Sequence, residues 1–168
     1  MATKDYSSIQ ERQVAEYMDW QVVSGSGAAK CHPGDVIGED WLGECKTHVK
    51  PNQSIFFKYT VWQKICEEAM IKHRYPVVFT DDGSQKLSRT WCLFRSSMLN
   101  GLDVDIVKMP EKLKSSVNIS FINRELNEVI HTHKQNNISN NPVCINMDWH
   151  SESISICDID TFAELFRG

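Results

Sequence analysis

One strand–turn–strand pattern constrains the fold of this chain more than any other feature. Two short runs with apolar residues, 35–37 and 41–46, flank the dipeptide Glu39-Asp40 and predict an antiparallel β-hairpin with a two-residue loop. In that register Asp35 lies directly opposite Glu44, where cross-strand Cβ atoms are roughly 4.5–5.5 Å apart. The pattern therefore predicts two carboxylates side by side on one face of a sheet.

The residues around this pair predict a particular chemistry. Because strand side chains alternate, Lys46 shares the face of Glu44, whereas Cys45 points into the packed layer. Two neighbouring carboxylates repel each other unless a cation lies between them, and hard oxygen ligands suit Mg²⁺ or Mn²⁺. A lysine beside such an ion orients water and stabilises charge on a phosphate. We therefore expect phosphodiester hydrolysis, with an ordinary hairpin of solvated charges as the alternative.

The remaining pattern predicts a mixed sheet flanked by helices, which is an α/β fold. Possible capping boxes stand at the starts of three of the expected helices, in the pairs Ser8 and Glu11, Thr60 and Gln63, and Thr161 and Glu164. Outside the hairpin, we expect helices over 9–18, 61–73, 123–131 and 161–166, and strands over 21–23, 76–80, 90–94, 143–147 and 154–157.

Length and composition are those of a single globular domain. The 168 residues predict one domain over 1–168, with a core over about 8–96 and a C-terminal α/β extension over about 97–168. No apolar run approaches the ~20 residues that span a bilayer, and the first residues lack the apolar core of a secretory signal. We therefore expect a cytoplasmic protein without a membrane partner. The six cysteines form no C-x-x-C pair, which favours reduced thiols.

Charge is distributed unevenly along the chain. Residues 44–74 and residues 84–114 each hold six Lys or Arg against three Asp or Glu, while residues 1–43 and 115–168 each hold three against seven. The formal net charge of −4 argues weakly against nucleic acid as a partner, but the basic middle leaves a local nucleic-acid surface open.

Several short motifs follow one another in a fixed order. Together they resemble the PD-(D/E)xK nuclease superfamily, in particular the archaeal and phage-type Holliday-junction resolvases. The resemblance covers roughly residues 8–96 and rests on Glu11-Arg12, Val22-Val23-Ser24-Gly25-Ser26-Gly27, Gly34-Asp35-Val36, Glu44-Cys45-Lys46-Thr47, Lys50-Pro51-Asn52-Gln53-Ser54, Trp62-Gln63-Lys64 and Pro76-Val77-Val78-Phe79.

The resemblance implies a restriction-endonuclease-like sheet and a Mg²⁺-dependent, structure-selective DNA endonuclease, with Mn²⁺ able to substitute. It implies that Asp35, Glu44 and the backbone carbonyl of Cys45 bind the metal and that Glu11 completes the site. It also implies that Lys46 lies beside the attacking water. Cleavage of a four-way junction on both sides requires two active sites, so we expect a homodimer with an isologous interface. If the chain is phage-encoded, the compartment is the host cytoplasm.

The same resemblance implies further roles around the phosphate. Ser24 and Ser26 are expected near the scissile phosphate, Gln63 is expected to point toward the site, and Lys50, Lys58 and Lys64 are expected to contact DNA phosphates. Two features depart from the family pattern. Gly34 separates Pro33 from the first acid, and the negative C-terminal third differs from the broad basic face of resolvases.

Other interpretations remain open at this point. The chain could be a nuclease of the same fold that nicks DNA or acts as a restriction enzyme, or a DNA- or protein-binding module with an idle site. A zinc site could combine Cys31-His32 with Cys45 and His48, although the spacing within each half is wrong for a zinc knuckle. A cysteine nucleophile with a histidine base is also possible, but no specific pair is indicated.

Overall fold

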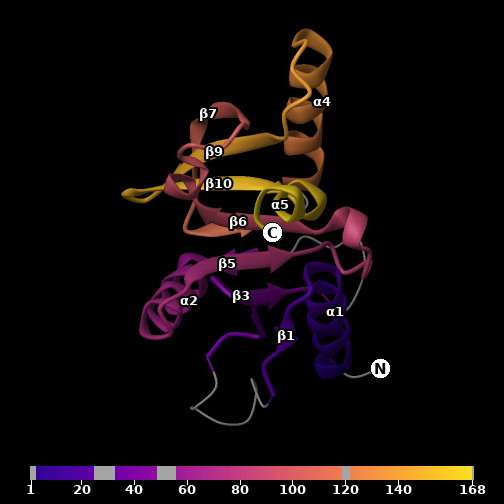
Figure 1. Ribbon diagram of the computed structural model, residues 1–168, viewed down its shortest axis with the longest axis vertical. Coiled ribbons are helices and arrows are strands. Elements are labelled where there is room, and N and C mark those ends of the chain that lie inside the picture. Colours follow the sequence, from indigo (N-terminus) through magenta and orange to yellow (C-terminus); the bar gives the residue numbers. More distant parts are fainter. Residues whose placement is uncertain (1–2, 25–32, 49–55, 119–121, 168) are drawn as a thin grey trace.

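The computed structural model describes residues 3–24, 33–48, 56–118 and 122–167. Figure 1 shows a broad sheet whose strands run across the view, with helices packed around it. In chain order the elements are α1 (Thr3–Met18), β1 (Gln21–Val22), β2 (Val36–Ile37), β3 (Trp41–Lys46), β4 (Phe56–Lys58), α2 (Tyr59–Ile71), β5 (Tyr75–Thr80), η1 (Leu87–Arg89), β6 (Trp91–Arg95), η2 (Ser96–Leu99), β7 (Asp105–Leu113), β8 (Ser116–Asn118), η3 (Ile122–Leu126), α4 (Asn127–Asn136), β9 (Val143–Trp149), β10 (Glu152–Asp158) and α5 (Ile159–Phe166).

Eight strands of the described ranges form one mixed sheet in the order β1-β2-β3-β5-β6-β10-β9-β7, which Figure 1 shows from bottom to top. β1, β2 and β3 are antiparallel neighbours, and β5 then lies parallel to β3. The connection between these two parallel strands contains β4 and α2. β4 also pairs with β8 in a separate two-stranded sheet. The predicted α/β class, a mixed sheet flanked by helices, is confirmed.

Alternation along β3 separates two apolar layers. Trp41 and Cys45 pack on one face with buried residues of α1 and α5, whereas Leu42 packs on the other face with buried residues of α2 and α4. α1 and α5 therefore cover one face of the sheet, and α2 and α4 cover the opposite face. Both layers exclude water from the centre of the sheet.

The strands that follow residue 96 continue the same sheet. β10 lies between β6 and β9 and pairs with both of them in antiparallel fashion. Phe162 of α5 packs edge-on against Trp41 of β3, with ring centroids 5.0 Å apart, and against Phe94 of β6 at 5.4 Å. The C-terminal part of the chain thus helps to build the core against which β3 is held.

The C-terminal hairpin also fixes the start of α2. The Glu152 carboxylate accepts hydrogen bonds from the Tyr59 hydroxyl at 2.6 Å and from the Trp62 indole N–H at 3.0 Å. The hydrogen bond to Glu152 raises the pKa of Tyr59 to about 12, so the phenol stays protonated. Contacts across 90 and 93 positions of the chain therefore anchor the first turn of this helix.

α1 begins earlier than the sequence pattern indicates. The helix begins at Thr3, so Ser8 lies in its interior and its carbonyl accepts a hydrogen bond from the Arg12 guanidinium. The predicted capping box of Ser8 and Glu11 is therefore wrong. Glu11 therefore does not cap α1, and this structural alternative to a functional role of Glu11 is removed.

The other two capping boxes are also wrong. α2 is preceded by Lys58 at its N-cap, with no side-chain cap hydrogen bond, which places Thr60 inside the first turn. α5 is capped by Asp158, whose carboxylate accepts the backbone N–H of Thr161 at 2.8 Å. The pattern of a hydroxyl residue followed three positions later by Glu or Gln also occurs inside helices, where it marks no boundary.

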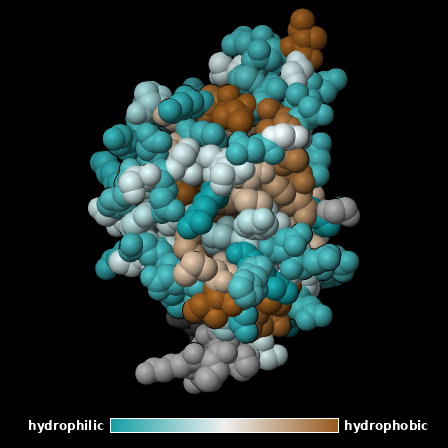
Figure 2. All heavy atoms as spheres, turned by 60° about the vertical axis from the view of Figure 1, so that its left-hand side comes forward, coloured by the Kyte–Doolittle hydropathy of each residue, from teal (hydrophilic) through white to brown (hydrophobic). Residues whose placement is uncertain are grey.

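In the described ranges no helix is both long and apolar enough to cross a bilayer. Figure 2 shows a mainly hydrophilic face with a few separate apolar patches. The most exposed large apolar side chains of α2 are Met70 and Ile71 in its last turn, at 71% and 72% exposure.

Candidate active site

The hairpin that opens the site has the predicted register. Val36 pairs with Gly43 and Ile37 pairs with Leu42. The backbone N–H of Gly38 donates to the carbonyl of Trp41 at 2.9 Å and closes the two-residue loop. The next position before β2 is Asp35, whose backbone N–H donates to the Gly43 carbonyl of β3 at 2.8 Å.

A glycine with a left-handed backbone places Asp35 at this point. Gly34 has φ +70°, and a Cβ atom at this position would lie 2.8 Å from the Leu42 side chain. Its backbone N–H donates to the Glu68 carboxylate of α2 at 2.9 Å, and Glu68 also pairs with Lys64 at 3.6 Å. Gly34, which separates Pro33 from Asp35, is thus required by the tight entry into β2.

Glu44 and Lys46 lie on the same face of β3 as Leu42, the face that α2 covers. The Glu44 side chain is 8% exposed and pairs with the Lys46 ammonium at 2.8 Å, while Lys46 retains 35% exposure. The Asp35 carboxylate accepts the backbone N–H of Cys45 at 2.8 Å. The Cys45 side chain packs in the layer on the opposite face, as the alternation predicts.

α1 brings a third carboxylate to the same neighbourhood. The pKa of Glu11 is raised from 4.5 to about 7, first because burial removes water and then because the negative charges of Asp35 and Glu44 act on it. The positive charge of Lys46 partly opposes this rise. Gln10, the preceding residue of α1, donates its amide to the backbone carbonyl of Lys46 at 3.1 Å and ties the helix to the end of β3.

The electrostatics keep the lysine charged. Burial opposes the ammonium form of Lys46, but the ion pair with Glu44 and the charge of Asp35 outweigh it, so the pKa of Lys46 lies above its usual value. Burial, together with the same carboxylates, raises the pKa of the Cys45 thiol well above its usual value. Cys45 is therefore poorly suited to act as a nucleophile.

Asp81 adds a buried acid that the sequence analysis did not single out. Its carboxylate accepts hydrogen bonds from the Thr47 hydroxyl and from the backbone N–H of Gly83, and burial raises its pKa. Its own backbone N–H donates to the carbonyl of Lys46 at 3.2 Å. A sequence signal did exist, because Asp81 directly follows a buried strand and the carboxyl ends of parallel strands meet at one edge of a sheet.

The other predicted site residues lie at the surface or outside the described ranges. Ser24 follows β1 and is exposed, as are Gln63 in the first part of α2 and Lys58 at the end of β4. Lys64 is exposed and paired with Glu68. Ser26 and Lys50 lie outside the described residues, as do Cys31 and His32 of the zinc alternative.

The donor set suits a hard divalent cation. In the described part of the chain, no three His, Cys, Asp or Glu side chains form a ready metal-binding group, since Glu44 is turned to Lys46 and Asp35 to a backbone N–H. The negative charges of Asp35 and Glu44 nevertheless act on Glu11 there, and the Lys46 ammonium only partly offsets them. The buried Oε1 of Gln10 also has no hydrogen-bond partner among the described residues. Oxygen donors of this kind fit Mg²⁺, which retains several of its waters.

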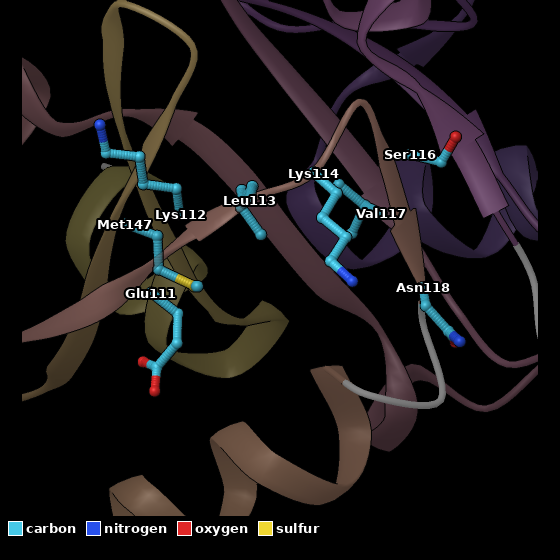
Figure 3. A pocket seen from close by; sticks show the side chains of 8 residues that line it. All are labelled: Glu111, Lys112, Leu113, Lys114, Ser116, Val117, Asn118 and Met147. Carbon is cyan, nitrogen blue, oxygen red and sulfur yellow. The ribbon is translucent and has the colours of Figure 1, made fainter.

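Two cavities lie in the C-terminal half of the chain. One, of about 360 Å³, opens between the end of β7, β8 and Met147 of β9, and Figure 3 shows Lys112 and Glu111 extending in opposite directions from β7. The second, of about 520 Å³, lies between α4 and Val107 of β7. None of the residues lining either cavity belongs to the acidic cluster at the end of β3.

Comparison of the chain with protein-family models, with curated proteins and with solved structures finds no match.

Proposed function

We propose that this protein is a Mg²⁺-dependent DNA endonuclease with a restriction-endonuclease-like core and that its substrate is branched DNA such as a Holliday junction. One observation carries the proposal. Burial, together with the negative charges of Asp35 and Glu44, raises the pKa of Glu11 to about 7, and Lys46 pairs with Glu44 at 2.8 Å in the same cluster. Perturbed pKa values cluster at functional sites, although ion-pair networks with purely structural roles shift them too.

The connectivity around this cluster supports the same proposal. A helix that carries an acid, an antiparallel three-stranded meander, a crossover helix and a strand parallel to β3 follow one another as α1, β1–β3, α2 and β5. The resemblance to the PD-(D/E)xK superfamily implies this order, with the acids on the second and third strands. The order of the sequence motifs and the order of the elements both favour this class of fold.

The proposed mechanism assigns a task to each group of the cluster. Asp35, Glu44 and the Cys45 carbonyl would hold the ion, with Glu11 completing its surroundings directly or through water. The bound ion supplies Lewis-acid polarisation of the phosphate and a more acidic water. Lys46 orients the attacking water and stabilises the negative charge that develops on the phosphate. The pKa of Lys46 is raised, which keeps it cationic for this task.

The proposed substrate class follows from the resemblance and from the charge distribution. Lys50, Lys58 and Lys64 belong to the basic segment 44–74 and are proposed to contact phosphates. Symmetric cleavage of a junction requires a homodimer with an isologous interface. The acidic segment 115–168 favours a second candidate within the same fold, a nuclease of unbranched DNA with a narrower contact surface. The proposed compartment is the cytoplasm, or the host cytoplasm for a phage-encoded chain.

Cleavage assays on matched substrates test the proposal. We expect the protein to cut a synthetic four-way junction in Mg²⁺ or Mn²⁺, faster than a linear duplex of the same sequence, and to be inactive in EDTA. Nicking of supercoiled plasmid without preference for the junction would select the second candidate. DNA binding that weakens steeply with salt, but without cleavage in either metal, would instead identify an idle binding module.

A further inference from the structure

Thr80 has a buried hydroxyl for which the fold provides no partner. The residue ends β5 and is fully buried, at 0% exposure. Its Oγ1 forms no hydrogen bond with any described residue. A buried hydroxyl without a partner is unfavourable, and valine would fill the same space without that penalty. The hydroxyl therefore requires an explanation outside the packing of the sheet.

Register places this hydroxyl beside the catalytic lysine of the proposed mechanism. Lys46 and Thr80 are Cα partners in the parallel pairing of β3 and β5, so their side chains leave the sheet on the same face. Neighbouring strands are about 4.8 Å apart, a distance that a lysine side chain easily spans. At present the Lys46 ammonium leans back along β3 to the Glu44 carboxylate at 2.8 Å.

The ion pair of Lys46 with Glu44 conflicts with the proposed metal site. A carboxylate that is hydrogen-bonded to an ammonium is a poorer ligand for a cation, and the two positive charges repel each other at close range. When Glu44 turns to a divalent ion, the ammonium loses its partner while its side chain is only 35% exposed. An acceptor on the neighbouring strand would satisfy it there.

We propose that Thr80 is this second acceptor: binding of a divalent cation by Asp35 and Glu44 moves the Lys46 ammonium from Glu44 to the Thr80 hydroxyl. The inference rests on the proposed metal site and assigns Thr80 as a positioning residue. The exchange couples occupancy of the site to the release of Lys46, so that the lysine becomes available to water and phosphate when the ion is present.

The exchange predicts a specific effect of Thr80→Val. Without the hydroxyl, Lys46 stays on Glu44 and competes with the cation, so we expect Mn²⁺ binding to weaken about tenfold. Thr80→Ser retains the acceptor and is expected to bind Mn²⁺ like the wild type. The melting temperature of Thr80→Val without metal is expected to equal or exceed that of the wild type, since a partnerless hydroxyl is removed.

Titration calorimetry with MnCl₂ on the wild type, Thr80→Val and Thr80→Ser tests the inference, and Thr80→Ala serves as a second variant without the hydroxyl. Lys46→Met removes the competitor, so adding Thr80→Val to that background is expected to change the affinity no further. Equal affinity of the wild type and Thr80→Val, or an equal loss in Thr80→Ser, would overturn the inference alone. Failure of the wild type to bind Mn²⁺ would overturn the metal site as well.

Discussion

Asp35→Asn, Glu44→Gln and Lys46→Ala are each expected to lower the rate of Mg²⁺-dependent junction cleavage by on the order of 10³-fold or more, with the fold intact. The first two changes remove a charged oxygen ligand while keeping the shape of the side chain. The third removes the ammonium that acts on water and phosphate. Single-turnover cleavage of a labelled four-way junction measures the rates, and circular dichroism checks folding.

A matched substitution in the same hairpin controls for the loss of charge itself. Glu39 lies exposed in the two-residue loop, so Glu39→Gln makes the chemical change of Glu44→Gln away from the cluster. We expect Glu39→Gln to cleave at the wild-type rate. The account is contradicted if Glu44→Gln remains fully active, or if both glutamine variants lose activity equally.

Glu11→Gln is expected to raise the thermal stability and to lower the rate of DNA cleavage. A charged carboxylate at this position destabilises the folded protein but is proposed to complete the metal site. The folded protein raises the pKa of Glu11 from 4.5 to about 7, so it favours the protonated carboxyl. The stability that this preference contributes is complete below about pH 4.5 and is lost as the pH rises through about 7. Glutamine resembles the protonated form at every pH.

We therefore expect Glu11→Gln to melt at a higher temperature than the wild type at pH 8, with a much smaller difference at pH 4.5, in thermal unfolding with EDTA. We also expect it to cleave DNA at least tenfold more slowly, because a carboxylate that completes the metal site is lost. Glu16→Gln, an exposed change on the same helix, is expected to alter neither property. A lower melting temperature for Glu11→Gln at pH 8 would show that the acid is not under electrostatic strain.

The hairpin and its acids could be predicted from the sequence because their geometry is local. Loop length and alternation alone fix the pairing of Val36 with Gly43, and the observed register agrees. The start of α1 could not be predicted in this way, because its first turns are polar and Ser8 resembled a cap. Local patterns thus gave the strands of the site but not all of its helix boundaries.

The edge strand β7 was missed for a physical reason. It contains Pro110, which normally argues against a strand, but the pairing with β9 shifts register between Lys108 and Lys112 and the proline falls within that irregularity. The short partners β4 and β8 were also missed, since three-residue strands carry almost no periodic signal. Their pairing depends on the rest of the fold.

The polar neighbours of the cluster were missed because long-range pairing brings them there. Glu68 reaches Gly34 across 34 positions of the chain, and Thr47 reaches Asp81 across the same separation. Thr80 lies beside Lys46 only through the parallel register of β3 and β5. A single sequence indicates which residue types such a site contains. The strand order and register of the sheet determine which of these residues lie close together.

The central claim is that Asp35 and Glu44 share one divalent ion beside Lys46. Anomalous diffraction from crystals soaked in MnCl₂ tests it most directly. We expect one manganese peak at coordination distance from both carboxylates and from the Cys45 carbonyl, with the Lys46 ammonium no longer on Glu44. Manganese bound elsewhere, with the pair of Lys46 and Glu44 unchanged, would contradict the account.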